Sequence, residues 1–373
     1  MSSIAIFPQP NNHLAPQLPI AWYNDASVYA AEQQYLFANA PKYAGHTLMV
    51  PNAGDFYVQD WLHGAKNLIN QQGDIALVSN VCRHRQAIML NGRGNTQNIV
   101  CPLHRWTYDL NGTLLGAPHF DQNPCLHLQK TPLQNWQGML FESPDNIIHE
   151  LNALGCKNDF DFSNYQLDSV NVEHYQFNWK TFIEVYLEDY HVGPFHPGLN
   201  QVVDCNELKW DFGENFSAQT VGYKDGAEQH LSPAYKIWQA EIKRLHKYKP
   251  PKHGAIWMVY YPFLMMEWYP NVLVVSHLIP TGVDSCSNVV EFYYPEEIAC
   301  FERAYVNAQQ AAYNETAIED KEICQRMHNG RQALYAQQID QRGPYQYPLE
   351  SGLQHFHQWY RRQMQSVLDD RVV

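Results

Sequence analysis

The pattern of apolar and polar positions divides the chain into two parts. From Gly45 to about Glu142, short apolar runs alternate with turns rich in Gly, Asn and Pro. Short strands separated by turn residues are typical of an all-β module. Within it, Thr107–Leu110 and Thr113–Leu115 flank Asn111-Gly112, which predicts a hairpin with a type I′ turn.

After residue 145 the apolar runs become longer and helical periods appear. Ser169–Phe177 is predicted to be a strand, and so are four segments rich in Val, Tyr, Trp and Met: Ile256–Tyr261, Leu264–Trp268, Val272–Ile279 and Val289–Tyr294. Four segments predict helices: Asn178–Val192, Pro295–Ala312, Ala317–Met327 and Leu353–Leu368. Between Gly198 and His253 we expect loops and short helices. Together, these strands and helices predict an antiparallel sheet flanked by helices, which is an α+β domain.

These changes of pattern predict three parts of the chain. Residues 1–40 are expected to form an arm and a helix, Ser27–Ala40, that packs on the larger domain. Residues 41–145 are expected to form the all-β domain, and residues 146–373 the α+β domain. The turn residues Ser143-Pro144-Asp145 mark the boundary between them.

Charge and composition exclude some classes of protein. Lys and Arg number 25 against 38 Asp and Glu, so the formal net charge is −13, and nucleic-acid phosphates would be repelled. The sequence contains no run of about 18 apolar residues, so we expect no membrane span. The N-terminus has no basic segment followed by an apolar one, and six of the eight cysteines show no regular spacing. We therefore expect a cytoplasmic protein with reduced thiols.

Two short motifs offer one cysteine and one histidine each: Cys82-Arg83-His84 and Cys101-Pro102-Leu103-His104. Zinc would accept this set, although structural zinc sites more often use paired Cys-x-x-Cys knuckles. One Cys and one His from each loop is what a Rieske [2Fe–2S] cluster needs, since one iron takes both thiolates and the other takes both imidazoles. We favour the cluster over zinc.

The segment that carries these motifs, from Asn80 to Pro118, resembles the cluster-binding domain of the Rieske non-heme iron oxygenases. Ligand types, order and spacing all match that family. The resemblance implies that Cys82, His84, Cys101 and His104 hold a [2Fe–2S] cluster.

A second candidate metal site follows in the helix predicted from Asn178. Glu188 and His191 stand three residues apart and would share a helix face, and Gly193-Pro194 would end the helix so that His196 can approach His191. Two histidines and one carboxylate make the facial triad of a non-heme Fe(II) oxygenase.

The carboxylate of that triad should come from far along the chain. Thr316 and Glu319 form a capping-box pattern, which would place Asp320 in the first turn of a helix. Asp320 lies three, four and seven residues before Ile323, Cys324 and Met327, and therefore on the apolar face, where a charge needs a partner or a metal. The alternative is a carboxylate that only complements the helix dipole.

The segment from Asn178 to His196 also resembles the Rieske oxygenases, which implies a mononuclear iron held by His191, His196 and Asp320 and a helix-grip (START-like) catalytic domain. In that family an acidic residue three before the first histidine bridges it to a cluster histidine of a neighbouring subunit. Here that residue is Glu188, and its partner would be His104. Val185 replaces an Asn common in the family. A glutamate bridge resembles the branch that oxidises quaternary ammonium compounds such as carnitine.

The resemblance implies a terminal oxygenase that hydroxylates or demethylates a small organic molecule. It would use O2 and electrons from NAD(P)H, delivered by a flavin/iron–sulfur reductase, and would work as a homotrimer. The alternatives are an aromatic-ring dioxygenase or aromatic O-demethylase of the same family, and a non-catalytic Rieske electron carrier.

Two groups of residues bear on the substrate and on the reductase. Aromatic residues near the predicted sheet could surround a cation or simply pack on the sheet: Trp257, Tyr260, Tyr261, Trp268 and Tyr269. Arg83, Arg85 and Arg105 flank the cluster motifs, either as a docking patch for an acidic reductase or in local salt bridges.

Overall fold

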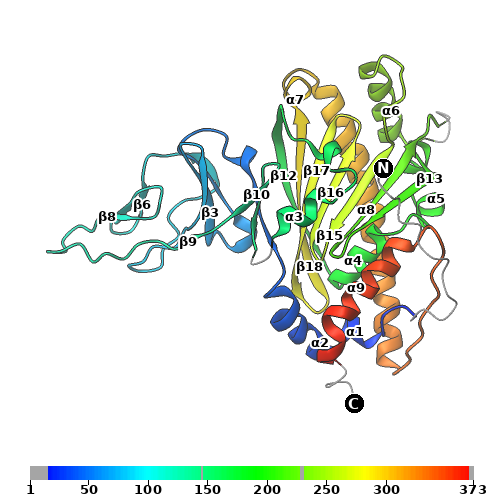
Figure 1. Cartoon of the computed structure of the whole chain (residues 1–373), viewed down its shortest axis with the longest axis horizontal. Helices are drawn as coiled ribbons and strands as arrows, with labels where there is room; N and C mark the ends of the chain where they lie inside the picture. Colours follow the sequence, from blue (N-terminus) through cyan, green and yellow to red (C-terminus); the bar gives the residue numbers. More distant parts are fainter. Residues whose placement is uncertain (1–15, 144–145, 227–230, 369–373) are drawn as a thin grey trace.

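The computed structural model describes residues 16–143, 146–226 and 231–368. A smaller β part stands at one end of the long axis, and a large sheet with helices occupies the rest (Figure 1). The expected α+β architecture, an all-β module beside an antiparallel sheet flanked by helices, is confirmed.

The β part contains three small antiparallel sheets. Their strand orders are β5-β2-β3-β4-β9, β6-β7-β8 and β1-β11-β10. The strands are β1 (Lys42–His46), β2 (Asp55–Val58), β3 (Lys66–Gln71), β4 (Asp74–Ser79), β5 (Arg93–Asn95), β6 (Ile99–Val100), β7 (Thr107–Tyr108), β8 (Leu114–Gly116), β9 (Lys130–Thr131), β10 (Gln134–Trp136) and β11 (Met139–Glu142).

The predicted hairpin is present as β7 and β8, but its turn is not type I′. That turn needs positive φ at both central residues, and of the pair only Gly112 has it, at 84°. Instead, the Asp109 carboxylate accepts a hydrogen bond from the Thr113 amide at 2.8 Å, and the Asp109 carbonyl accepts one from the Gly112 amide. The side chain of Asp109 therefore closes a longer turn.

The large part is built on one seven-stranded antiparallel sheet in the order β12-β18-β17-β16-β15-β14-β13. All five predicted strands are present in it. The strands are β12 (Tyr165–Tyr175), β13 (Val203–Phe212), β14 (Phe216–Tyr223), β15 (Ala255–Tyr260), β16 (Leu264–Tyr269), β17 (Val272–Gly282) and β18 (Ser285–Pro295).

The expectation of loops between Gly198 and His253 is wrong, because β13, β14 and helix α6 (Pro233–Leu245) lie there. β14 contains Ser, Ala, Gln and Gly, which favour strands weakly, and its ladder with β15 extends the sheet. Tertiary pairing thus decides this segment rather than local preference.

The other helices cover the sheet and join the two ends of the chain. They are α1 (Ala21–Asn24), α2 (Ala26–Ala31), the π-helical η1 (Glu32–Phe37), α3 (Ile147–Asn152), α4 (Trp179–Tyr186), α5 (Val192–Phe195), α7 (Glu296–Phe301), α8 (Arg303–Ala336) and α9 (Ser351–Leu368). Short 3-10 turns occur at η2 (Thr47–Met49), η3 (Asp60–Leu62), η4 (Lys157–Phe160) and η5 (Leu199–Gln201). The N-terminal α1 contacts α8, while α2 and η1 contact α9.

A buried ion pair fastens the N-terminal segment to this core. Lys180 Nζ on α4 lies 2.5 Å from Glu32 Oε1 on η1, and both side chains are fully buried. Trp179 Nε1 donates to the other oxygen of Glu32 at 3.0 Å, and the Tyr360 hydroxyl on α9 donates to Oε1. Burial lowers the pKa of Lys180, which the Glu32 charge opposes.

Candidate metal centres and substrate cavity

The two cysteine-histidine motifs adopt the same backbone conformation. The Cys82 amide donates to the Ala87 carbonyl, and the Cys101 amide donates to the carbonyl of Trp106, five residues on in both cases. Residues Gln86 and Arg105, each four after its cysteine, both have positive φ near 60°. The two loops are therefore matched turns that present their side chains to a common point.

The side chains at that point fit a two-iron cluster. Cys82 and Cys101 are buried, and the ring centres of His84 and His104 are 4.7 Å apart. His84 Nδ1 is buried without a hydrogen-bond partner among the described residues, which suits a nitrogen that faces a metal. Two thiols on the inner side and two imidazoles further out match the donor set of a Rieske cluster.

The segment that carries Glu188 and His191 is not a continuous helix. Asn178 caps α4 as its side chain accepts from the Lys180 amide, but α4 ends at Tyr186. Beyond α4, the backbone bonds to the C-terminal segment instead of continuing the helix: the Leu187 carbonyl accepts a hydrogen bond from the Leu353 amide. Gly193-Pro194 lies within the short α5 and does not end a helix there. The helix expected over Asn178–Val192 is therefore confirmed only for Trp179–Tyr186 and is wrong beyond it, although His191 and His196 do converge.

The capping box expected at Thr316 and Glu319 is also absent, because both residues lie inside α8. The Thr316 hydroxyl bonds the Tyr235 hydroxyl at 2.5 Å, and Glu319 Oε2 lies 2.7 Å from His196 Nδ1. The Ala-, Gln- and Glu-rich sequence of α8 favours one uninterrupted helix. Asp320 is thus in the helix interior, which removes the alternative of a carboxylate at a helix N-terminus.

His191, His196 and Asp320 form a group whose ligand atoms all lie within 4.8 Å of one another. Asp320 Oδ1 is 3.0 Å from His196 Nε2 and 3.5 Å from His191 Nε2. Glu188 Oε1 lies 2.6 Å from the other nitrogen of His191. The second nitrogen of each imidazole thus faces a further carboxylate, the usual arrangement around metal-binding histidines.

The charges around this group favour a bound cation. Burial alone would lower the pKa of His191, but hydrogen bonds and charges of Asp320 and Glu188 raise it to about 10. Burial alone would raise the pKa of Asp320, but the two imidazoles lower it to about 2. Two histidines and one aspartate with nearby acidic side chains fit a divalent iron.

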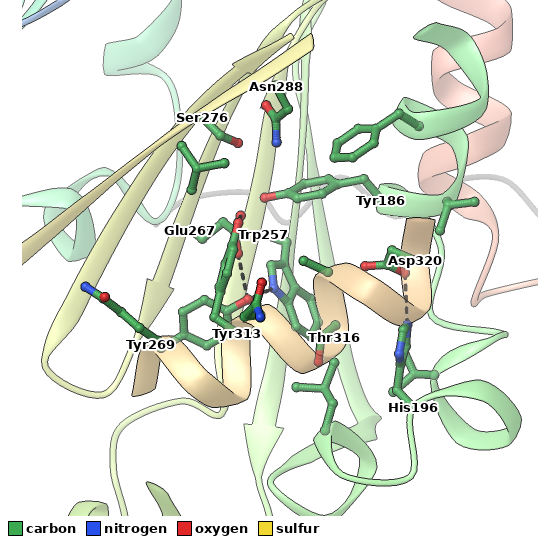
Figure 2. A pocket seen from close by; sticks show the side chains of 18 of the residues that line it. Tyr186, His196, Trp257, Glu267, Tyr269, Ser276, Asn288, Tyr313, Thr316 and Asp320 are labelled. Atoms are coloured by element: carbon green, nitrogen blue, oxygen red, sulfur yellow. Dashed lines mark hydrogen bonds and ion pairs between the residues drawn. The ribbon is translucent and has the colours of Figure 1, made fainter. Parts of the chain in front are cut away.

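A cavity of about 410 Å³ opens onto His191, His196 and Asp320. Of the aromatic residues predicted to surround a cation, Trp257 and Tyr269 line it, whereas Tyr260, Tyr261 and Trp268 do not. Figure 2 shows His196 and Asp320 on one side of the cavity and Glu267 with Tyr269 on the other.

Glu267 is a cavity residue that was not predicted from the sequence. It is buried on β16, where it accepts hydrogen bonds from the hydroxyls of Tyr269 at 2.6 Å and Tyr313 at 3.0 Å. Burial raises the pKa of Glu267 to about 7 although these bonds lower it. The available signal was a single acidic residue within the apolar run Leu264–Tyr269.

Two protein families match the chain. Residues 162–366 match the ring hydroxylating alpha subunit (catalytic domain), and residues 43–136 match the Rieske [2Fe-2S] domain. The chain belongs to the Rieske oxygenase alpha subunits. This Rieske oxygenase is therefore an enzyme with a [2Fe–2S] cluster and a mononuclear non-heme iron, as expected from the sequence, and the match to the catalytic domain argues against a non-catalytic electron carrier.

Among curated relatives, the putrescine 2-hydroxylase of Ralstonia nicotianae is 55% identical over 348 residues, which cover 93% of this chain and 95% of that protein. The putrescine 2-hydroxylase of Bordetella bronchiseptica is 48% identical over 96% of this chain and 87% of its own. The choline monooxygenase of Beta vulgaris is 25% identical over 95% of this chain and 78% of its own.

Solved structures share the fold of this Rieske oxygenase. A quaternary ammonium Rieske monooxygenase aligns with a TM-score of 0.74 and 19% identity, over 94% of this chain and 96% of its own. The naphthalene 1,2-dioxygenase of Rhodococcus sp. aligns with a TM-score of 0.70 and 18% identity, over 94% and 95%. In the described part of the chain, no helix has the length and apolar character needed to cross a membrane.

Proposed function

We propose that this Rieske oxygenase hydroxylates putrescine, or a closely related short diamine, at carbon 2. Two relatives that are 55% and 48% identical are putrescine 2-hydroxylases. The iron would be held by His191, His196 and Asp320, and the cluster by Cys82, His84, Cys101 and His104.

One observation carries the choice of substrate: the cavity beside the three iron ligands holds buried hydrogen-bond acceptors that have no donor. Among the described residues, Gln219 Oε1, Asn288 Oδ1 and the Tyr186 oxygen are buried without a partner. Each unpartnered buried group costs free energy unless the ligand satisfies it. A primary ammonium brings three N–H donors and suits such a wall, whereas an aromatic hydrocarbon does not.

The chemistry is a hydroxylation in which substrate, O2, two electrons and two protons give the alcohol and water. When bound, the iron supplies the activation of O2 at an aliphatic C–H bond. The chain itself positions the substrate and excludes water from a mostly apolar cavity. The two electrons come from NAD(P)H through a reductase and the cluster.

We further propose a homotrimer in which Glu188 bridges His191 to His104 of a neighbouring subunit. In one chain the cluster loops and the iron ligands belong to separate parts of the molecule (Figure 1). Leu103 beside His104 and Tyr190 beside His191 are 56% and 57% exposed, and a contact between subunits would cover both. These apolar neighbours support the trimer.

We also propose that an acidic reductase docks beside the cluster and that the protein is cytoplasmic. Arg83, Arg85 and Arg105 are exposed and form no ion pair with a described residue, which supports docking of an acidic reductase beside the cluster. No disulfide joins any of the eight cysteines, all of which lie in the described residues, and this supports a reducing, cytoplasmic setting.

A single-turnover assay tests the substrate. The purified holoenzyme is reduced chemically and exposed to ¹⁸O2 with putrescine, choline, L-carnitine or benzoate in separate reactions. We expect one labelled oxygen in putrescine and none in the other compounds. The proposal would be overturned if benzoate or a quaternary ammonium compound were oxidised and putrescine were not. It would also be overturned if the iron-loaded enzyme gave no product from any of the four compounds.

A further inference from the structure

We infer that Glu267 is the specificity-determining residue of this cavity and binds one primary ammonium group of the substrate. The inference rests on the proposed function and deepens it. It identifies the side chain that distinguishes a primary from a quaternary ammonium compound.

The hydrogen bonds around Glu267 fix it as an acceptor. Trp257 Nε1 donates to the Tyr269 oxygen at 2.8 Å, so the Tyr269 hydroxyl proton is free to point to Glu267 Oε2. Tyr313 donates to Oε1 from the opposite side. Each carboxylate oxygen accepts one hydroxyl and keeps a second lone pair. The carboxylate is therefore held rigidly, with its remaining acceptor capacity available to a ligand.

Among the described residues, Glu267 lacks the cation that Glu32 and Glu184 have, and it lines the cavity, whereas Glu291, which is also buried without a cation, does not. Glu32 is paired with Lys180, and Glu184 with Arg331 at 2.6 Å. No described Lys, Arg or His forms an ion pair with Glu267, and no cation is among the groups that shift its pKa. A buried unpaired carboxylate is costly, and a cationic ligand removes that cost. The missing cation is thus the substrate.

The shape of the site favours a primary ammonium over a quaternary one. A primary ammonium has N–H groups to donate to the remaining lone pairs of Glu267. A trimethylammonium group has no N–H to donate and would leave these acceptor sites unsatisfied. The rings of Trp257 and Tyr269 line the same wall and add attraction for a cation.

The position of Glu267 relative to the iron ligands suits a chain-like substrate. Tyr313, which holds Glu267, and Asp320 are seven residues apart on α8, two turns along the same face. The ammonium is thus held about two helical turns from the iron ligands. A short carbon chain anchored at Glu267 would extend toward Asp320 and present a C–H bond there.

The test compares Glu267→Gln with Glu291→Gln in the iron- and cluster-loaded enzyme. Glu291 is the matched control, because it is equally buried on the adjacent part of the sheet, accepts from Tyr43 and Tyr293, and lies outside the cavity. Loss of a buried charge pair predicts a rise of about 30-fold or more in the putrescine KM of Glu267→Gln. The kcat at saturation should change much less, and Glu291→Gln should keep both constants.

Calorimetric titration with putrescine and with choline separates the possible outcomes. In Glu267→Gln, the ratio of the putrescine affinity to the choline affinity should fall. Glu267→Asp keeps the negative charge, so the same ratio should fall less in this variant. Equal putrescine affinity in wild type and Glu267→Gln would overturn this inference and leave the proposed function intact. If wild type neither binds nor hydroxylates putrescine, both are overturned.

Discussion

At the residue scale, each of the two candidate iron-binding histidines contacts a carboxylate through the ring nitrogen that faces away from the proposed iron. Glu188 contacts Nδ1 of His191 and Glu319 contacts Nδ1 of His196, while both Nε2 atoms face Asp320. The motif around His191 could be predicted from the sequence because all its residues are local. The role of Glu319 was missed, because the sequence pattern placed Glu319 in a capping box, whereas the residue lies inside α8 and contacts His196.

We expect Glu188→Gln to keep the visible spectrum of the cluster and lose most multiple turnover. An amide cannot hold the His191 imidazole as a carboxylate does, and the proposed bridge to His104 would be weakened. Steady-state oxidation with NAD(P)H and reductase, alongside the absorption spectrum, measures this. Full turnover in the variant would contradict the bridging role.

For Glu319→Gln we expect a 10- to 100-fold loss of iron affinity at the mononuclear site, since partners of metal-binding histidines contribute about that much. Iron release to a chelator, monitored separately from the cluster, measures the effect. Glu322→Gln is the control on the same helix, because Glu322 is exposed and, among the described residues, pairs only with Arg326. The same release rate in both variants would refute a role for Glu319.

At the element scale, the strands β12 and β15 to β18 were predicted well, whereas β13, β14 and the helix ends were not. β15 to β18 are rich in apolar and β-branched or aromatic residues, so their local pattern already favours strands. Contacts with distant residues replace the helix ends that were predicted: the Leu353 amide bonds the Leu187 carbonyl after α4, and the Tyr235 hydroxyl bonds the Thr316 hydroxyl inside α8. Such partners leave no local signal in the chain.

The Glu32–Lys180 pair permits a test of how the N-terminal segment is attached. Lys180→Met leaves Glu32 buried without its cation, and we expect the free energy of unfolding to fall by about 3–5 kcal/mol. Denaturant unfolding followed by fluorescence measures the change. The double variant Glu32→Gln/Lys180→Met should recover most of the loss, and a double variant as unstable as the single one would contradict the pairing argument.

At the scale of the whole molecule, Glu291 lies where the large sheet meets the β part. The hydroxyl of Tyr43 on β1 donates to Glu291 Oε2 at 2.7 Å, as does Tyr293 at 2.6 Å. The other oxygen, Oε1, is buried without a partner among the described residues. Burial raises the pKa of Glu291 from 4.5 to about 7, which the two hydroxyls only partly oppose.

This shift predicts that Glu291 makes the protein less stable as the pH rises. Between pH 4.5 and about 7 the folded state keeps a proton that the unfolded state has lost, so about 3 kcal/mol of stability disappears over that range. In Glu291→Gln the melting temperature should fall less between pH 5 and pH 8 than in wild type. Parallel pH profiles for the two proteins would contradict the prediction.

The length of α8 also constrains how this protein can evolve. Tyr313 and Asp320 would serve the proposed ammonium site and the proposed iron site from one helix face. Deleting or inserting one residue between them would rotate one side chain relative to the other by about 100°. Substitutions in this segment can change the sites one at a time, but a change in length would separate them, so insertions are tolerable only outside it.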